Sequence, residues 1–178
     1  MVATLQSRTL PDQADFHAAI AERGDRWYSA CLSITRDRGL AEDAVQDALL
    51  SAWNKRSQFD GKARLSTWIH RIAINAALRL LRKGRPGVFE PLDADVADTA
   101  AAPDELTERT ELGGRLAQAL TGLSPFERIC FVLRHLEDWR LAEIAEEIET
   151  SPGAVKQAIF RAVRKLRHGE PLIESDRS

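Results

Sequence analysis

The stretch LAEIAEEIETSPGAVKQAIFRAVRKLRH, residues 141–168, is the part of the sequence that best indicates the fold. Residues 141–148 have the length and pattern of a short acidic helix. Ser151 and Pro152 follow, and these residue types are preferred at the N-cap and at the first position of a helix. The apolar positions after them recur every three or four residues, as on the buried face of an amphipathic helix: Val155, Ile159, Ala162 and Leu166. Two helices joined by about three residues have the spacing of a helix-turn-helix.

The outward face of the second helix carries groups suited to DNA. In a helix-turn-helix this helix enters the major groove, with its N-terminal residues nearest the base edges. The candidates for base contact are Gly153, Lys156, Gln157 and Phe160. Lysine can bond to guanine, glutamine to adenine, and an aromatic ring can pack on a thymine methyl group. Arg161 and Arg164 lie further along and are better placed for phosphates. The segment alone leaves open an antiparallel helix pair with a solvated basic face.

Three helices are predicted in the N-terminal part of the chain. Apolar residues recur at three- and four-residue spacing within residues 40–53, where Trp53 ends the stripe. A first helix is expected upstream over residues 16–34, and a third downstream over residues 65–80. No strand pattern interrupts them, and three helices without strands make a small bundle.

The fold class is therefore all-α, with two small helical domains. The first domain is expected over residues 12–84 and the second over residues 112–169. Within the second, Ser124-Pro125-Phe126-Glu127 predicts a capping box that opens a helix ending near Leu136. Residues 85–111 are rich in Pro, Ala and Asp, and they predict a flexible acidic linker between the domains.

The net charge hides a strong segregation of charge along the chain. The protein has 25 basic and 27 acidic residues, a formal net charge of −2, which argues against a protein that coats nucleic acid by bulk charge. Residues 61–90, however, carry 7 basic residues and 1 acidic residue. Residues 91–112 carry the reverse, 1 basic residue and 7 acidic residues. Residues 153–168 carry 5 basic residues and no acidic residue. Because each basic segment can neutralise only a few phosphates, we expect the isolated chain to bind duplex DNA poorly.

Aromatic residues accompany the first basic segment. Residues 59–64 form a loop with cationic groups, and Trp68 follows in the first turn of the third helix. Aromatic rings beside a cationic track suit single-stranded or flipped bases, where stacking contributes about 1–3 kcal/mol per base. A core position for Phe59 or Trp68 is the alternative.

Catalytic and membrane functions find no support in the sequence. The four histidines are dispersed, and no metal-ligand spacing, phosphate loop or nucleophile elbow occurs. We therefore expect no catalytic residue, no metal and no cofactor. Cys31 and Cys130 are interpreted as packing residues. No run approaches the roughly 18 apolar residues of a membrane span, so we expect a cytoplasmic protein without membrane insertion.

Two groups of motifs resemble regions of the bacterial sigma factors of the sigma-70 family. Residues 41–48 (AEDAVQDA) with Trp53, followed by residues 68–75 (WIHRIAIN) and Arg82-Lys83, are similar to the second region of these proteins. The motifs similar to the fourth region are Leu123-Ser124-Pro125, Arg128, Glu143-Ile144-Ala145 and residues 155–162. The order of the motifs and the linker between them agree with the family over residues 16–167. A third folded domain is lacking, so the chain most resembles the extracytoplasmic-function (ECF) subgroup.

The resemblance implies a sigma factor that binds core RNA polymerase and directs promoter-specific initiation with promoter melting. It places Asp43, Gln46 and Asp47 against the clamp helices of the largest polymerase subunit, and it implies the polymerase flap and an anti-sigma factor as further partners. The residues implied for the minus-ten element are Phe59, Lys62, Arg64, Trp68, Arg71, Asn75, Arg79 and Arg82. Those implied for the minus-thirty-five element are Ser151, Gly153, Lys156, Gln157, Phe160, Arg161 and Arg164.

Some positions depart from the family pattern. Arg140 stands where a Ser or Thr cap is common, with Asp138 as the expected substitute cap. Glu149 occupies the position of the usual turn glycine, where a positive φ would cost it on the order of 1 kcal/mol. Two alternatives to a sigma factor remain at this point. One is a sigma mimic that sequesters an anti-sigma factor, and the other is a stand-alone helix-turn-helix repressor.

Overall fold

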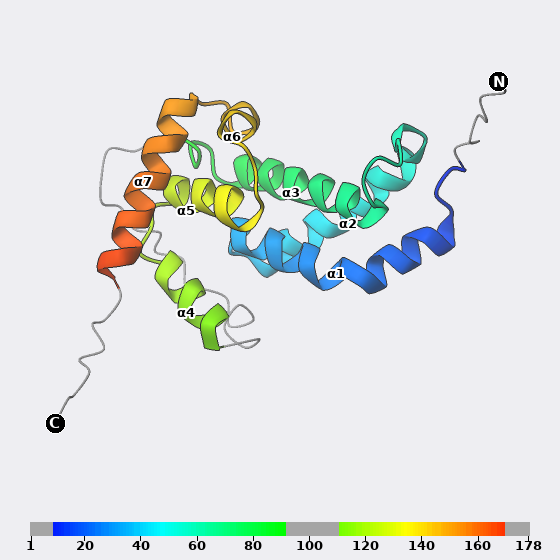
Figure 1. The fold of residues 1–178 in the computed structure, drawn as a ribbon, viewed down its shortest axis with the longest axis horizontal. Coiled ribbons are helices and arrows are strands. Elements are labelled where there is room, and N and C mark those ends of the chain that lie inside the picture. The colour runs from blue at the N-terminus through cyan, green and yellow to red at the C-terminus, as the bar shows by residue number, and fades with distance from the viewer. Residues whose placement is uncertain (1–8, 92–110, 170–178) are drawn as a thin grey trace, which may run out of the picture.

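The computed structural model describes residues 9–91 and 111–169, and all regular secondary structure within these residues is helical. The predicted all-α fold is confirmed. No helix among the described residues is long and apolar enough to cross a membrane. The helices form two groups, one from each part of the chain, which lie next to each other (Figure 1).

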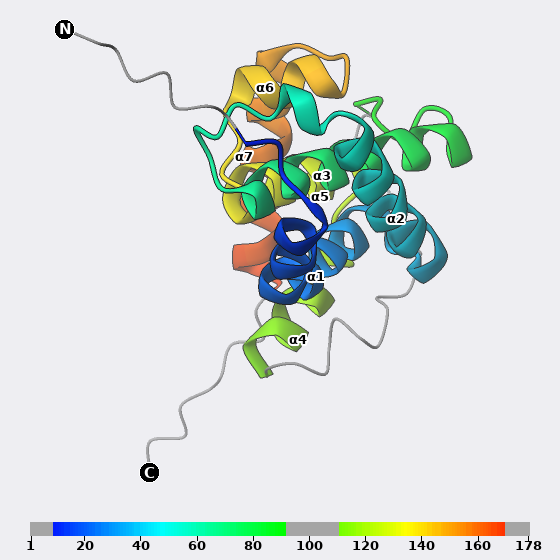
Figure 2. The ribbon, with the colours of Figure 1, turned by 90° about the vertical axis from the view of Figure 1, so that its right-hand side faces the viewer.

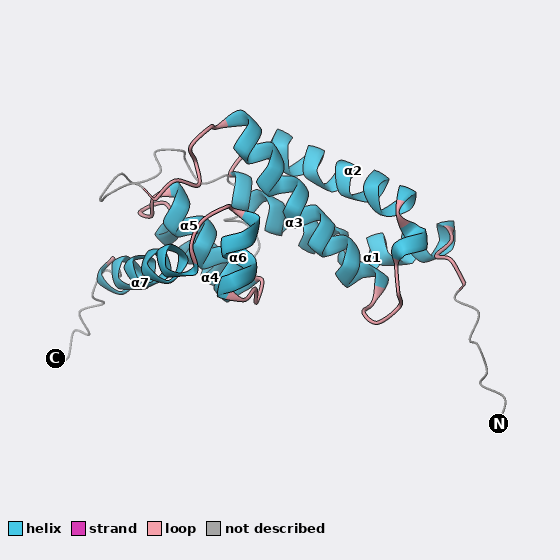
Figure 3. Cartoon of the chain, turned by 90° about the horizontal axis from the view of Figure 1, so that it is seen from above, coloured by secondary structure: helices cyan, strands magenta, loops and turns pink. Residues whose placement is uncertain are grey.

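Three long helices build the first group: α1 (Gln13–Thr35), α2 (Arg38–Asn54) and α3 (Leu65–Gly84). Each of them packs on the other two, and the three run alongside one another (Figure 3). Trp27 of α1 is fully buried, and its indole Nε1–H donates a hydrogen bond to the carbonyl oxygen of Ser66 at 3.1 Å. The ring therefore fills the core while its one polar atom is satisfied.

Helix α2 buries only alanine side chains. Its buried residues are Ala41, Ala44, Ala48 and Ala52, each with no exposed surface. Methyl side chains allow neighbouring helices to approach closely, so this row sets how tightly α2 lies on the bundle. The larger members of the predicted apolar stripe lie beside the row, and Trp53 keeps 37% of its surface exposed.

The second group contains α4 (Glu111–Leu120), α5 (Pro125–Phe131), α6 (Leu141–Glu147) and α7 (Pro152–His168). Helix α5 continues into a π-helical turn over Val132–Leu136, which ends where the sequence predicts. Helix α7 packs on both α5 and α6. Viewed along the long axis of the molecule, α6 and α7 lie on the opposite side of α3 from α2 (Figure 2).

The predicted capping box at the start of α5 is confirmed. The hydroxyl oxygen of Ser124 accepts the Glu127 N–H at 3.2 Å, and the Glu127 carboxylate accepts the Ser124 N–H at 3.1 Å. The start of α6 differs from the prediction, because Arg140 rather than Asp138 is the N-cap. The Arg140 N–H donates to the Glu143 carboxylate at 2.8 Å, while Asp138 takes a positive φ of 57° in the preceding turn.

The structure describes residues 85–91 of the predicted linker and its last residue, Glu111, which begins α4. Residues 85–91 form turns in which Val88 and Phe89 are buried, so these residues are folded rather than extended. The remaining linker residues, 92–110, lie outside the described part of the chain.

Both cysteines are buried, as their apolar sequence context predicts. Burial raises the pKa of Cys31 and of Cys130 to about 12. Both thiols therefore stay protonated near neutral pH, and a protonated thiol is a poor nucleophile.

The turn between α6 and α7 stores backbone strain at Glu149. This residue has a φ of 56°. The positive value agrees with the expectation for a position where a turn glycine is usual. Its side chain is exposed, so no packing contact depends on it.

We predict that Glu149→Gly stabilises the protein by about 1 kcal/mol. An L-residue in the left-handed region costs about 1–2 kcal/mol, and the extra freedom of glycine in the unfolded chain offsets part of the gain. Urea unfolding followed by circular dichroism measures the change. The matched control is Glu146→Gly, which introduces glycine inside α6 and should destabilise by about 1 kcal/mol. Equal losses in both variants would contradict strain at Glu149.

Candidate nucleic-acid interface

The orientation of α7 is set by a buried carboxylate on α5. Glu127 is 3% exposed and lies at the capping box described above. One carboxylate oxygen accepts a hydrogen bond from the Lys165 ammonium group at 3.0 Å, and the other accepts one from Arg161 Nε at 3.2 Å. Two cations of α7 thus neutralise one buried anion, which removes the cost of an unpaired buried charge.

The electrostatics of Glu127 follow from these contacts. Burial by itself raises the pKa of this carboxyl group. The hydrogen bonds from Lys165, from the Ser124 N–H and from Arg161 together outweigh burial, so the pKa lies below the ordinary value of 4.5. Glu127 is therefore ionised near neutral pH and holds both cations.

The opposite face of α7 is exposed. Lys156, Gln157 and Arg164 point away from the rest of the group, and Phe160 is 68% exposed. Arg161 differs from the other residues expected on this face, because its guanidinium is held by Glu127 and its side chain is only 32% exposed. A helix that shows lysine, glutamine and an aromatic ring on one face has the groups needed to contact base edges.

The N-terminal end of α7 is open. Ser151 is the N-cap, and its hydroxyl oxygen accepts the Ala154 N–H at 3.1 Å. Gly153 is exposed, and a Cβ atom placed on it would come no closer than 3.9 Å to another side chain. Because Gly153 has no side chain, the first turn of α7 leaves room for a nucleic-acid backbone to approach closely.

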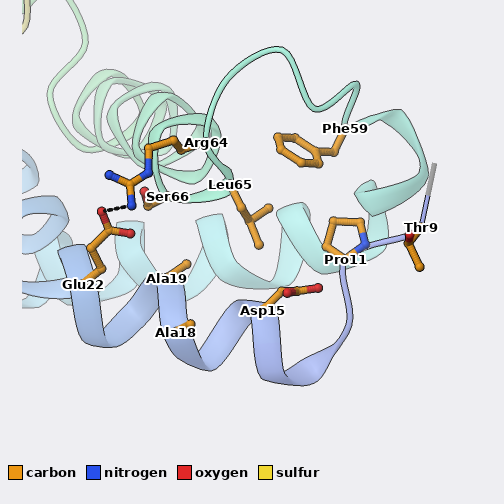
Figure 4. Close-up of a pocket in the computed structure, with 10 residues that line it drawn as sticks. All are labelled: Thr9, Pro11, Asp15, Ala18, Ala19, Glu22, Phe59, Arg64, Leu65 and Ser66. Atoms are coloured by element: carbon orange, nitrogen blue, oxygen red, sulfur yellow. Dashed lines mark ion pairs between the residues drawn. The ribbon is translucent and has the colours of Figure 1, made fainter. Parts of the chain in front are cut away.

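The loop before α3 places two aromatic rings together. The rings of Phe59 and Trp68 lie 5.3 Å apart at an angle of 48°, and both residues are half-buried. Phe59 borders a hollow of about 280 Å³ between this loop and the start of α1, with Pro11 and Leu65 also on its wall (Figure 4). Trp68 packs against the core as well. The core interpretation therefore holds in part for Trp68, and both rings keep an exposed portion.

Lys62 and Arg64, the two cationic residues of this loop, differ in how closely they contact a carboxylate. Lys62 is 87% exposed and lies 3.8 Å from the Asp60 carboxylate. Arg64 forms an ion pair with Glu22 of α1 at 2.8 Å, drawn as the dashed line in Figure 4. Exposed pairs of this kind contribute about 0–1 kcal/mol, so a phosphate can replace the carboxylate at little cost.

Basic residues along α3 make contacts of different kinds. Arg79 lies 3.5 Å from Asp47 of α2. Arg71 and Arg82 contact the second helical group instead, at Trp139, Glu143 and Glu147. Among the described residues, the side-chain oxygen of Asn75 is buried without a hydrogen-bond partner. A buried polar atom of this kind costs about 1–3 kcal/mol.

The polar face of α2 lies on the far side from the alanine row. Asp43 and Gln46 are exposed, and Asp47 is half-buried beside Arg79. Leu50, one turn further on, is 65% exposed, and sequence reasoning missed it as part of this face. The signal was present, because Asp43, Asp47 and Leu50 follow at spacings of four and three residues.

Two family models match the chain. The model described as Sigma-70 region 2 matches residues 20–86, and the model described as Sigma-70, region 4 matches residues 113–166. The first match covers α2, α3 and most of α1, and the second covers α5, α6 and most of α7.

Known proteins align with most of the chain. The ECF RNA polymerase sigma factor SigG of Mycobacterium tuberculosis is 34% identical over 185 residues, covering 89% of this chain and 50% of that protein. This chain therefore spans about half the length of SigG. The ECF RNA polymerase sigma factor SigW of Bacillus subtilis is 29% identical, covering 88% of this chain and 89% of SigW.

A solved structure has a similar fold. It is the sigma factor RpoE from Bartonella quintana, determined in complex with the anti-sigma factor NepR. The TM-score is 0.55 at 22% sequence identity, and the match covers 92% of this chain and 99% of that chain.

We predict that Glu127→Gln lowers the free energy of unfolding by about 2 kcal/mol near neutral pH, since hydrogen bonds to charged groups contribute about 1.5–3 kcal/mol. Because the folded-state pKa of Glu127 is depressed, its contribution is complete above the ordinary carboxyl pKa and is lost as the pH falls through the folded-state value. The wild-type protein should therefore lose stability more steeply below about pH 4.5 than the variant does.

Urea unfolding at a series of pH values measures both effects. Glu146→Gln removes an exposed carboxylate and should leave the pH dependence unchanged. Parallel curves for the wild type and Glu127→Gln would show that the carboxylate does not hold α7.

Proposed function

Because the chain belongs to the sigma-70 family, with relatives in the extracytoplasmic-function group, we propose that it binds core RNA polymerase and directs it to specific promoters. The proposal includes strand opening at the minus-ten element and requires no catalytic residue, metal or cofactor in this chain. It places the chain in the cytoplasm with the polymerase, and it keeps residues 12–84 and 112–169 as the two functional domains.

The observation that carries the proposal is the arrangement of α7. Glu127 holds Arg161 and Lys165 on the inner side, and this contact presents Lys156 and Gln157 on the outer side. We assign the outer side to the minus-thirty-five element, through Ser151, Gly153, Lys156, Gln157, Phe160 and Arg164. Arg161 acts in this assignment by orienting the helix rather than by binding a phosphate.

We assign α3 and the loop before it to the melted strand of the minus-ten element. The rings of Phe59 and Trp68, tilted at 48° to each other, offer a platform for an unpaired base, and the exposed Lys62 lies on the loop beside them. The further residues of this surface are Arg64, Arg71, Asn75, Arg79 and Arg82. An aromatic pair among cations is the composition that single-stranded nucleic acid requires.

We assign the polar face of α2 to the clamp helices of the polymerase. Asp43, Gln46 and Asp47 supply charge and amide groups there, and Leu50 adds an exposed apolar side chain in line with them. A polar face around an apolar residue is the usual composition of a protein interface. The second domain would contact the polymerase flap.

An anti-sigma factor is part of the proposal. RpoE of Bartonella quintana was solved with the anti-sigma factor NepR, and we extend that kind of partner to this chain. The repressor alternative leaves the α2 face without a role. A sigma mimic that only sequesters an anti-sigma factor would have no use for the exposed cations of α7.

Two experiments test the proposal in sequence. Overproduction of the chain followed by transcript sequencing identifies the promoters that respond. Purified core polymerase with the purified chain should then initiate at those promoters, whereas core polymerase alone should not. Binding to core polymerase without initiation at any induced promoter would favour the mimic, and promoter binding without any affinity for core polymerase would favour the repressor.

We predict that Asp47→Arg weakens binding to core polymerase by at least about tenfold, because a charge reversal in an interface costs more than 1.4 kcal/mol. Titration of labelled chain with core polymerase measures this. Arg79→Ala is the control, since it breaks the same 3.5 Å ion pair but keeps the carboxylate. Equal weakening by the two variants would assign the effect to the ion pair and not to the polymerase contact.

We predict that Lys156→Ala lowers initiation about tenfold at cognate promoters and leaves core binding unchanged, because a base contact contributes about 1–3 kcal/mol. The loss should concentrate at one base position in a library with a randomised minus-thirty-five element. Arg164→Ala should instead weaken all library members alike, as a phosphate contact does. An unaltered base preference in Lys156→Ala would remove this residue from promoter reading.

A further inference from the structure

Phe160 is the phenylalanine that does not contribute to the core. The chain has 6 phenylalanines, and all except Phe160 are buried or half-buried, whereas Phe160 is 68% exposed. Phe16, for example, packs edge-on against Trp53 with ring centroids 5.2 Å apart, and Phe126 is 2% exposed in the core of the second group. A ring left in water does not gain the free energy of apolar burial. The apolar surface of Phe160 is therefore available to a partner.

The ring of Phe160 cannot turn inward, because the other side of α7 is fixed to the second group. Ala158 and Ala162, two positions before and after Phe160, are fully buried. Positions two apart lie on nearly opposite sides of a helix with 3.6 residues per turn. The Nε of Arg161 donates to the Glu127 carboxylate at 3.2 Å, which restricts rotation of the helix further. Phe160 is thus held on the outer side of α7.

The ring lies in the middle of the polar face that we assign to the minus-thirty-five element. Lys156 and Arg164 are four positions before and after Phe160, so each lies about 6 Å away along the helix axis on the same face. Both side chains are exposed. When the lysine contacts a base edge and the arginine a phosphate, the ring between them faces the floor of the major groove.

The floor of the major groove presents one apolar group that a phenyl ring can match. The base edges offer hydrogen-bond donors and acceptors, and thymine adds a methyl group at C5. A ring placed on a donor or acceptor displaces water from it and supplies no hydrogen bond, which is unfavourable. A ring placed on a methyl group removes apolar surface of both partners from water.

We propose that Phe160 reads the 5-methyl group of a pyrimidine in the minus-thirty-five element. The inference rests on the proposed function, because it takes the outer side of α7 as the surface that contacts this element. The methyl group adds the same gain on either pyrimidine base. Thymine is therefore preferred over uracil, and 5-methylcytosine over cytosine, by similar factors. Methylation of a cytosine at this position raises initiation from the promoter.

Templates that differ by a single methyl group test the proposal. A promoter library with a randomised minus-thirty-five element first identifies the position at which Phe160→Ala relaxes the base preference. Four templates then carry thymine, uracil, 5-methylcytosine or cytosine at that position. Initiation is measured with the full chain and core polymerase below saturation. The wild-type chain should initiate about fourfold better on the methylated member of each pair, which is the factor expected for burial of one methyl group.

Three variants separate the ring from the rest of the face. Phe160→Ala should bring both methyl ratios to about one, and circular dichroism should show an unchanged fold because the side chain is exposed. Phe160→Leu keeps an apolar side chain of smaller area and should retain ratios of about two. Gln157→Ala is the matched control on the same face. It should lower initiation and leave both ratios at the wild-type values.

The outcomes separate this inference from the proposed function. Ratios of about one for the wild-type chain, or wild-type ratios in Phe160→Ala, would overturn the methyl reading even if initiation is normal. If Phe160→Ala relaxes no base position and instead weakens binding to core polymerase, the ring contacts protein and the inference is wrong.

Binding of the free chain to the same library and the same four duplexes at low salt provides a readout that does not need polymerase. Fluorescence anisotropy should give the same fourfold ratios. Fourfold ratios in binding without initiation at any promoter would overturn the proposed function and keep the methyl reading. Ratios of about one in binding as well as in initiation would overturn the methyl reading.

Discussion

The buried carboxylate of Glu127 is the constraint on which the second helical group depends. A carboxylate removed from water must be surrounded by donors, and here they come from the Ser124 N–H, Arg161 and Lys165. This one requirement ties the start of α5 to the middle of α7. It also divides the cations of α7 into those that fix the helix and those, such as Lys156, that remain exposed.

The same reasoning connects the two helical groups. Arg128 and Glu137 are both removed from water, and each has its partners on the other group. Polar contacts of this kind are specific in geometry but add little net stability, because desolvation offsets most of the attraction. They therefore define how the two groups sit against each other more than they add to the free energy of unfolding.

Sequence reasoning succeeded at most places where one helix carries its own information, with the cap of α6 as an exception. The capping box at Ser124 and Glu127, the apolar side of α7 and the positive φ of Glu149 are all local, and all are observed. It missed what depends on which helices meet. The periodicity of α7 shows on which side of the helix Arg161 lies. It does not show that the carboxylate of Glu127, on α5, lies within hydrogen-bonding distance of that side chain. Likewise nothing local in α3 indicates that Arg71 would lie on Trp139, 68 positions along the chain.

The alanine row of α2 has a consequence for which substitutions this helix can accept. Ala41, Ala44, Ala48 and Ala52 leave no space for a larger side chain, so drift at these sites is limited by packing. The opposite side of the helix, with Asp43 and Leu50, contributes nothing to that packing. One helix thus carries two separate constraints: its buried side cannot change in size, whereas its exposed side can change without disturbing the bundle beneath it.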